Sequence, residues 1–94
     1  MTSVAIIGGV KGIEREYLDI AKDCNFKCKL FNQKCPQFDK KIKNVDACIL
    51  FTNTVSHKLS LESCKICKKH GIKMIKVHSS GITGLRQTLE ELSN

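Results

Sequence analysis

The sequence predicts an α/β fold: a three-layer α/β/α sandwich around a four-stranded parallel sheet, of the flavodoxin-like or Rossmann-like kind. Short apolar runs alternate with segments of helical periodicity along the 94 residues, which is typical of βα units. Two runs, "VAII" and "CILF", are continuously apolar, as central strands covered on both faces are. The other two, "FKCKLF" and "IKMIKV", carry lysines, which edge strands use against edge-to-edge pairing. These two kinds of run predict the strand order 2-1-3-4.

The first half of the chain is expected to contain two strands, each followed by a helix. Residues 3–8 predict the first strand and residues 26–31 the second. Between them, residues 12–24 predict a helix whose apolar side chains share one face, namely Ile13, Tyr17, Ile20, Ala21 and Cys24. A short helix is then expected to start at Pro36, which suits a first helical position, and to bury Phe38 and Ile42.

The second half repeats the alternation. Strands are expected over residues 46–51 and 72–77, and helices over residues 56–71 and 81–92. Gly71 is expected at the position just past the end of the 56–71 helix. The closing helix places Ile82, Leu85, Leu89 and Leu92 on one face. Right-handed crossovers then send the first helix to one face of the sheet and the next two to the other.

Length and composition predict one domain over residues 1–94 and exclude several classes of protein. No apolar run reaches the roughly 18 residues that a membrane helix needs. The N-terminus lacks the pattern of a secretion signal, so we expect a cytoplasmic protein with reduced thiols. The net charge is +7, yet fourteen of the sixteen basic residues are lysine and there is no Trp. This pattern favours a solvated lysine-rich surface over a nucleic-acid interface.

The predicted strand order also predicts where a ligand would bind. The connections after the first and third strands leave in opposite directions, and ligands of open α/β sheets bind in the crevice at such a point. The segments that reach this crevice are "GGVKG", "TNTVSH" and "HSSGITG".

The first segment offers Gly8, Gly9 and Lys11 for contact with an anion at a helix N-terminus. Its spacing matches neither the dinucleotide fingerprint nor the P-loop, and a full dinucleotide would need a second half that the chain lacks. The alternative is that the glycine pair only forms a tight turn with positive φ.

The second segment offers Thr52, Asn53, Ser56 and His57. Thr54 or Ser56 capping the next helix would explain the hydroxyl groups without any ligand. His57 needs another explanation, because a neutral imidazole at this rim suits a metal ligand or a general base as well as a structural hydrogen bond.

In the third segment, Ser79 and Ser80 are candidates either for anion binding or for capping the closing helix. His78 could meet His57 across the sheet and form a metal or proton-transfer site.

The "CKIC" motif has the spacing of a redox pair in an unsuitable context. A thioredoxin-like pair lies at a helix start, where the thiol pKa is lowered, whereas these cysteines fall in mid-helix. Leu61, Cys64 and Cys67 share one stripe there, so we interpret them as core.

The chain resembles a small bacterial family, domain of unknown function 2325, over nearly its whole length. The resemblance rests on "VAIIGG", "VDACILFTNTVSH", "KKHGIKMI" and "SSGITGLRQTLEEL", and most specifically on Asp46 before a strand and "T-x-x-V-S-H" after it. It implies a stand-alone Rossmann-like domain without an established activity. Some relatives are thought to bind haem, which would make His57 an axial-ligand candidate. This chain departs from the family pattern in two ways: "GGVKGI" lacks the usual acidic or arginine residue, and cysteine is unusually frequent.

Together these observations predict a binding domain rather than an enzyme, holding a small phosphate- or nucleotide-like anion at the crevice. One alternative is a haem or metal protein that uses His57. Another is a regulatory protein–protein interaction module, although the acidic cluster of a phosphoacceptor site is missing. Pairing with a second copy would stabilise a domain this small.

Overall fold

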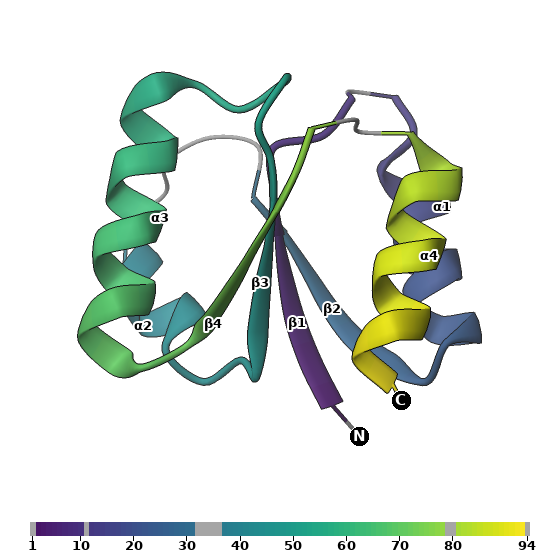
Figure 1. Ribbon diagram of the computed structural model, residues 1–94, viewed down its shortest axis with the longest axis horizontal. Helices are drawn as coiled ribbons and strands as arrows, with labels where there is room; N and C mark the ends of the chain where they lie inside the picture. The colour runs from purple at the N-terminus through teal and green to yellow at the C-terminus, as the bar shows by residue number, and fades with distance from the viewer. Residues whose placement is uncertain (1, 11, 32–36, 79–80, 94) are drawn as a thin grey trace.

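A four-stranded parallel sheet forms the middle layer of the computed structural model, which describes residues 2–10, 12–31, 37–78 and 81–93 (Figure 1). The strand order is β2-β1-β3-β4, as predicted. The strands are β1 (Thr2–Ile7), β2 (Phe26–Phe31), β3 (Ala47–Phe51) and β4 (Lys73–Val77). In the central pair, Val4 lies opposite Ala47 and Ile7 opposite Leu50.

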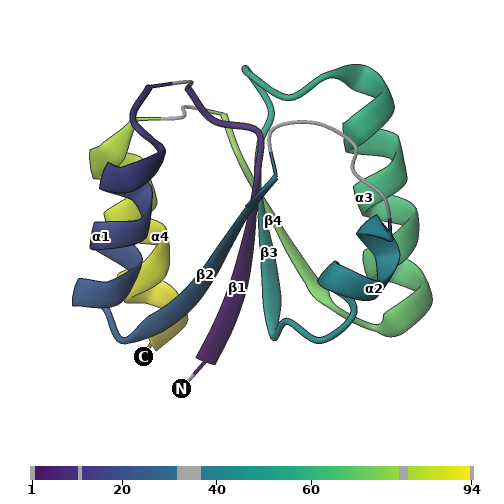
Figure 2. The ribbon, with the colours of Figure 1, turned by 180° about the vertical axis from the view of Figure 1, so that it is seen from behind.

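Two helices cover each face of the sheet. Helices α1 (Glu14–Asp23) and α4 (Ile82–Ser93) pack on one face, and α2 (Phe38–Ile42) and α3 (His57–His70) on the other, as Figure 2 shows from behind. The division of the core follows from the alternation of side chains along a strand, because Val4 and Ile6 join the α1/α4 cluster while Ala5 and Ile7 join the α2/α3 cluster. The central strands β1 and β3 are therefore apolar at every buried position.

Most element boundaries agree with the sequence prediction to within two residues. Helix α1 begins at Glu14 rather than residue 12, because Gly12 has a φ of +98° that no α-helix contains. Pro36 lies outside the described residues, and the helix that it was expected to start begins at Phe38. Gly71 ends α3 in the left-handed conformation, as expected.

One core prediction was wrong. Leu61 is 53% exposed and points away from the sheet. The buried stripe of α3 is Leu59, Ser63, Ile66 and Cys67. A serine takes part in this stripe because its hydroxyl group donates a hydrogen bond to the carbonyl oxygen of Leu59, at 2.7 Å.

Candidate functional site

The loops after β1 and β3 meet at the carboxyl ends of the two central strands, and they leave the sheet in opposite directions (Figure 1). The amide of Gly9 donates a hydrogen bond of 2.8 Å to Thr54 Oγ1 in the other loop. A Cβ atom on Gly8 would lie 3.1 Å from Val55 Cβ and 3.2 Å from the carbonyl oxygen of Phe51. Gly8 is thus a point of close approach between the two loops, where the lack of a side chain avoids crowding.

The amide groups of the glycine loop already have acceptors within the protein. Gly8 N–H donates to the carbonyl oxygen of Phe31 at 2.9 Å, and Val10 N–H donates to the phenol oxygen of Tyr17 at 3.1 Å. Gly12 N–H donates to a carboxylate oxygen of Glu14 at 2.9 Å, at the start of α1. An anion that approached these amides, or Gly9, would compete with neutral and charged internal acceptors. The loop therefore shapes the crevice, and any contact of Gly8 or Gly9 with a ligand stays a prediction.

The loop after β3 carries the polar side chains of the second segment. Thr52 N–H donates to the carbonyl oxygen of Val77 at 2.9 Å, which ties the loop to the end of β4. Ser56 caps α3, because its hydroxyl oxygen accepts from Leu59 N–H at 3.2 Å. The capping interpretation is therefore correct for Ser56. Thr54 instead joins the two loops, and it donates to the carbonyl oxygen of Phe51 at 3.5 Å.

Asn53 and His57 are the two exposed side chains of this segment whose polar groups have no partner among the described residues. His57 is the first residue of α3, a helix of 14 residues with no acidic side chain in its first turn. The partial positive charge at this helix end is therefore not compensated by a carboxylate. In contrast, α1 carries Glu14 and Glu16 in its first turn.

Three of the predicted site residues, Lys11, Ser79 and Ser80, lie outside the described residues. His78 is exposed after β4. Within the described residues, no cluster of three or more His, Cys, Asp or Glu side chains is placed to hold a metal ion.

Within the described residues, the side chains beside His57 on the rim are polar, and haem binding there stays a prediction. A haem needs an apolar cavity beside its axial ligand. His57 and its neighbours on the rim, Asn53 and Ser56, are exposed and polar. His57 also does not line either of the two grooves that flank β4.

Sequence reasoning placed Tyr17 in the core and missed its role at the rim. Its side chain is 1% exposed, its ring packs on Phe51 with centroids 5.6 Å apart, and its hydroxyl oxygen accepts from Val10. The ring also lies 3.0 Å from where a Cβ atom of Gly9 would be. A tyrosine on the buried face of the helix that follows a glycine loop is a signal for such a contact, because a buried hydroxyl group needs a partner.

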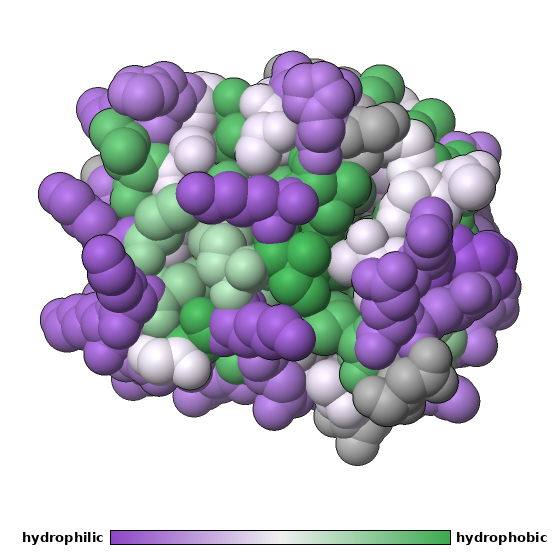
Figure 3. All heavy atoms as spheres, in the orientation of Figure 1, coloured by the Kyte–Doolittle hydropathy of each residue, from purple (hydrophilic) through white to green (hydrophobic). Residues whose placement is uncertain are grey.

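Two grooves flank the edge strand β4, and both are separate from the crevice. The groove between β4 and α3 has a volume of about 540 Å³ and is lined by Cys64, Cys67, Lys68, Ile72, Met74 and Lys76. A smaller groove of about 160 Å³ lies on the α4 side, beside Ile75 and Thr88. Figure 3 looks onto β4 and shows apolar surface between α3 and α4, with hydrophilic side chains lying across it.

Cys67 is buried in the core and the partly buried Cys64 packs against it, as the sequence predicted, and Cys67 is also in contact with Cys48. The sulfur atoms of Cys48 on β3 and Cys67 on α3 are 3.2 Å apart and share a hydrogen bond. That bond lowers the pKa of Cys67, whose sulfur accepts when it ionises, and together with burial it raises the pKa of Cys48. Cys28, on the other face of the sheet, has its pKa raised to about 12 by burial.

The helices formed by the described residues are all too short or too polar to cross a bilayer. Comparison with known proteins supports the fold and gives no activity. The sequence model of a family described as "Uncharacterized protein conserved in bacteria (DUF2325)" matches residues 3–92. No curated protein matches the sequence.

Two similar solved structures are both designed proteins. A de novo designed Rossmann fold protein has a TM-score of 0.69 at 13% identity, and the match covers 99% of this chain and 98% of that one. The solution NMR structure of a de novo designed Rossmann 2x2 fold protein has a TM-score of 0.63 at 19% identity, covering 99% and 88% of the two chains. The Rossmann-like fold predicted from the sequence is thus confirmed.

Proposed function

The chain belongs to the DUF2325 family of bacterial proteins, and we propose that it binds a small anionic ligand, phosphate- or nucleotide-like, in the crevice between β1 and β3. It would do so as a cytoplasmic binding domain without catalysis. The supporting observation is the hydrogen bond from Gly9 N–H to Thr54 Oγ1, which holds the two loops together at the point where the strand order reverses. Open α/β sheets bind their ligands at this point.

The distribution of charge favours the α3 side of the crevice over the α1 side. The carboxylate of Glu14 already occupies the amide of Gly12 at the start of α1. The start of α3 has no acidic side chain, and Asn53 and His57 are exposed beside it. We therefore assign the contacts to Thr52, Asn53, Ser56 and His57, while Gly8 and Gly9 allow the loops to approach. Lys11, Ser79 and Ser80, which lie outside the described residues, stay predicted contacts that would add charge and hydroxyl donors.

Thermal unfolding in the presence of anions tests this proposal. We expect one member of a panel of inorganic phosphate, nucleoside phosphates and sugar phosphates to raise the melting temperature in a saturable manner. A ligand present at a hundred times its Kd stabilises the folded state by about 2.7 kcal/mol.

Matched variants locate the site. The double substitution Asn53→Ala with His57→Ala should abolish the stabilisation, because it removes the two exposed side chains of this loop whose polar groups have no partner among the described residues. His70→Ala, at the opposite end of α3, is the control and should retain it. A panel that leaves the melting temperature unchanged would refute the proposal, as would equal stabilisation of the wild type and the double variant.

A further inference from the structure

Cys48 and Cys67 form a buried pair of thiols that the crevice does not use. We propose that this pair is a peroxide-reactive site, in which Cys67 attacks a hydroperoxide that enters the groove beside β4 and Cys48 then closes a reversible disulfide. The pair shares no residue with the anion site proposed above, so the two proposals stand or fall separately.

The geometry brings the two sulfur atoms close to bonding distance. Cys48 is the second residue of the central strand β3, and Cys67 lies on the face of α3 that packs against the sheet. Their sulfur atoms are 3.2 Å apart, so they must approach by about 1.2 Å to reach the length of a disulfide bond.

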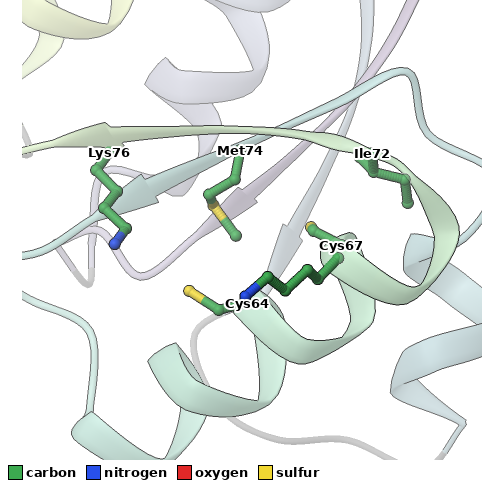
Figure 4. A pocket seen from close by; sticks show the side chains of 6 residues that line it. Cys64, Cys67, Ile72, Met74 and Lys76 are labelled. Carbon is green, nitrogen blue, oxygen red and sulfur yellow. The ribbon is translucent and has the colours of Figure 1, made fainter.

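Both thiols are buried, but only Cys67 lines the groove beside β4. Cys67 lines the groove of about 540 Å³, and Figure 4 shows it on α3 beside Cys64, with Met74 and Lys76 reaching from β4 on the opposite side. Cys48 is fully buried and is not among the groove's lining residues. A small oxidant that enters the groove therefore meets Cys67, which is 2% exposed at the groove wall, before Cys48, which is 0% exposed.

The electrostatic environment assigns the same order to the two residues. When Cys67 ionises, its sulfur can accept a hydrogen bond from the Cys48 thiol, which lowers the pKa of Cys67 against the opposing effect of burial, whereas the pKa of Cys48 is raised. Lys68 and Lys76 line the same groove and add positive charge near the thiolate. A thiolate is the nucleophilic form of cysteine, so Cys67 is the attacking residue.

The chemistry balances with the hydroperoxide as the named oxidant. The Cys67 thiolate attacks the peroxide O–O bond, a bond from sulfur to oxygen forms, and an alcohol or water leaves after taking up a proton. The Cys48 sulfur then attacks the sulfenic acid, the S–O bond breaks, and the hydroxide that leaves takes the proton of Cys48 to become water. Two electrons pass from the two thiols to the peroxide. A thiol reductant restores the pair, as expected for a transient disulfide in a reducing compartment.

Thiol counting on the full reduced chain tests the proposal. Treatment with stoichiometric hydrogen peroxide should remove two of its six thiols, and dithiothreitol should restore them. Digestion without reduction should yield a peptide pair joined through Cys48 and Cys67. A bond between Cys64 and Cys67, or retention of all six thiols, would overturn the proposal.

Variants assign the roles. In Cys67→Ser the rate of thiol loss to peroxide should fall by about tenfold or more relative to the wild type. Cys48→Ser should accumulate a sulfenic acid on Cys67 that dimedone traps, with no disulfide. Cys28→Ser, on the other face of the sheet, is the control and should react like the wild type. Wild-type rates in Cys67→Ser would contradict the assignment, and the peptide mapping of the unmodified sequence decides the question if a variant fails to fold.

Discussion

Gly8 has a φ of +92°, and its α-carbon faces the neighbouring loop. An added Cβ atom would lie 3.1 Å from Val55 Cβ and 3.2 Å from a backbone oxygen, so Gly8→Ala adds a steric clash to backbone strain. Gly12 has a similar φ of +98°, but a Cβ atom there would meet nothing within 4 Å. We expect Gly8→Ala to lower the free energy of unfolding by about 1–3 kcal/mol more than Gly12→Ala does. Urea unfolding of both variants measures the difference, and equal losses would show that the loops do not press on each other at Gly8.

The sequence indicated that Gly8 and Gly9 have a structural or binding role, but it did not show which role. A glycine pair after an apolar strand is compatible with a tight turn, an anion cradle or a close approach, and these differ only in what lies across from the backbone. Here the neighbours are Thr54 and Val55, which are more than 40 residues away in the chain. The topology predicted that the two loops would meet. It could not predict that Thr54 and Tyr17 would take up the loop's amides, because that depends on side-chain orientation.

Asp46 joins strands β1 and β3 at the end opposite the crevice. Its backbone N–H donates to the carbonyl oxygen of Ser3 at 2.8 Å, and its carboxylate accepts from Ser3 N–H at 2.7 Å. Asp46→Ala removes the second bond from a strand end, and we expect a loss of about 1–2 kcal/mol in the free energy of unfolding. Asp46→Asn keeps an acceptor oxygen and should lose less. Chemical denaturation of the two variants checks this order, and equal losses would show that the side-chain bond does not stabilise the pair.

For the strands, composition predicted the order, because a strand buried on both faces is apolar throughout whereas an edge strand can carry charged residues. Lys27 and Lys29 of β2 are exposed, as are Lys73 and Lys76 of β4, whereas β3 is buried throughout. Helical periodicity was less reliable within α3. Leu61 fits the apolar stripe by spacing, but the helix is oriented so that Leu59 and Ser63 face the sheet, while Cys64 is partly buried at the edge of the core. The two possible inward faces of α3 contain similar residue types, so sequence alone could not distinguish the two orientations of the helix.

The molecule as a whole carries cysteine thiols on both faces of its sheet, with the partly buried Cys28 towards α1 and α4 and the buried Cys48 towards α2 and α3. Their distribution could not be read as chemistry from the sequence, where the only close spacing is that of Cys64 and Cys67. The sulfur–sulfur contact on which the proposed disulfide depends joins Cys67 of α3 to Cys48 of β3. Packing of α3 on the sheet creates both this contact and the adjacent groove. Sequence patterns predict helices and strands, but they do not predict which side chains of two elements meet.

The burial of Cys28 is expected to make the stability of the domain depend on pH in the alkaline range. Burial raises the pKa of its thiol from the ordinary value of 9.0 to about 12 in the folded protein. Between these two values the unfolded chain releases a proton that the folded chain keeps, so the free energy of unfolding must fall as the pH rises through this window. Below pH 9 both states are protonated and the thiol contributes no pH dependence.

Cys28→Ala isolates this contribution in urea unfolding under reducing conditions. The loss of a small side chain lowers stability by the same amount at every pH, whereas the loss of the thiol removes part of the alkaline slope. We therefore expect the curves of the wild type and the variant to converge as the pH rises above 9. Parallel curves across this window would mean that the thiol ionises as readily in the folded chain as in the unfolded one, and hence that β2 leaves this position open to water.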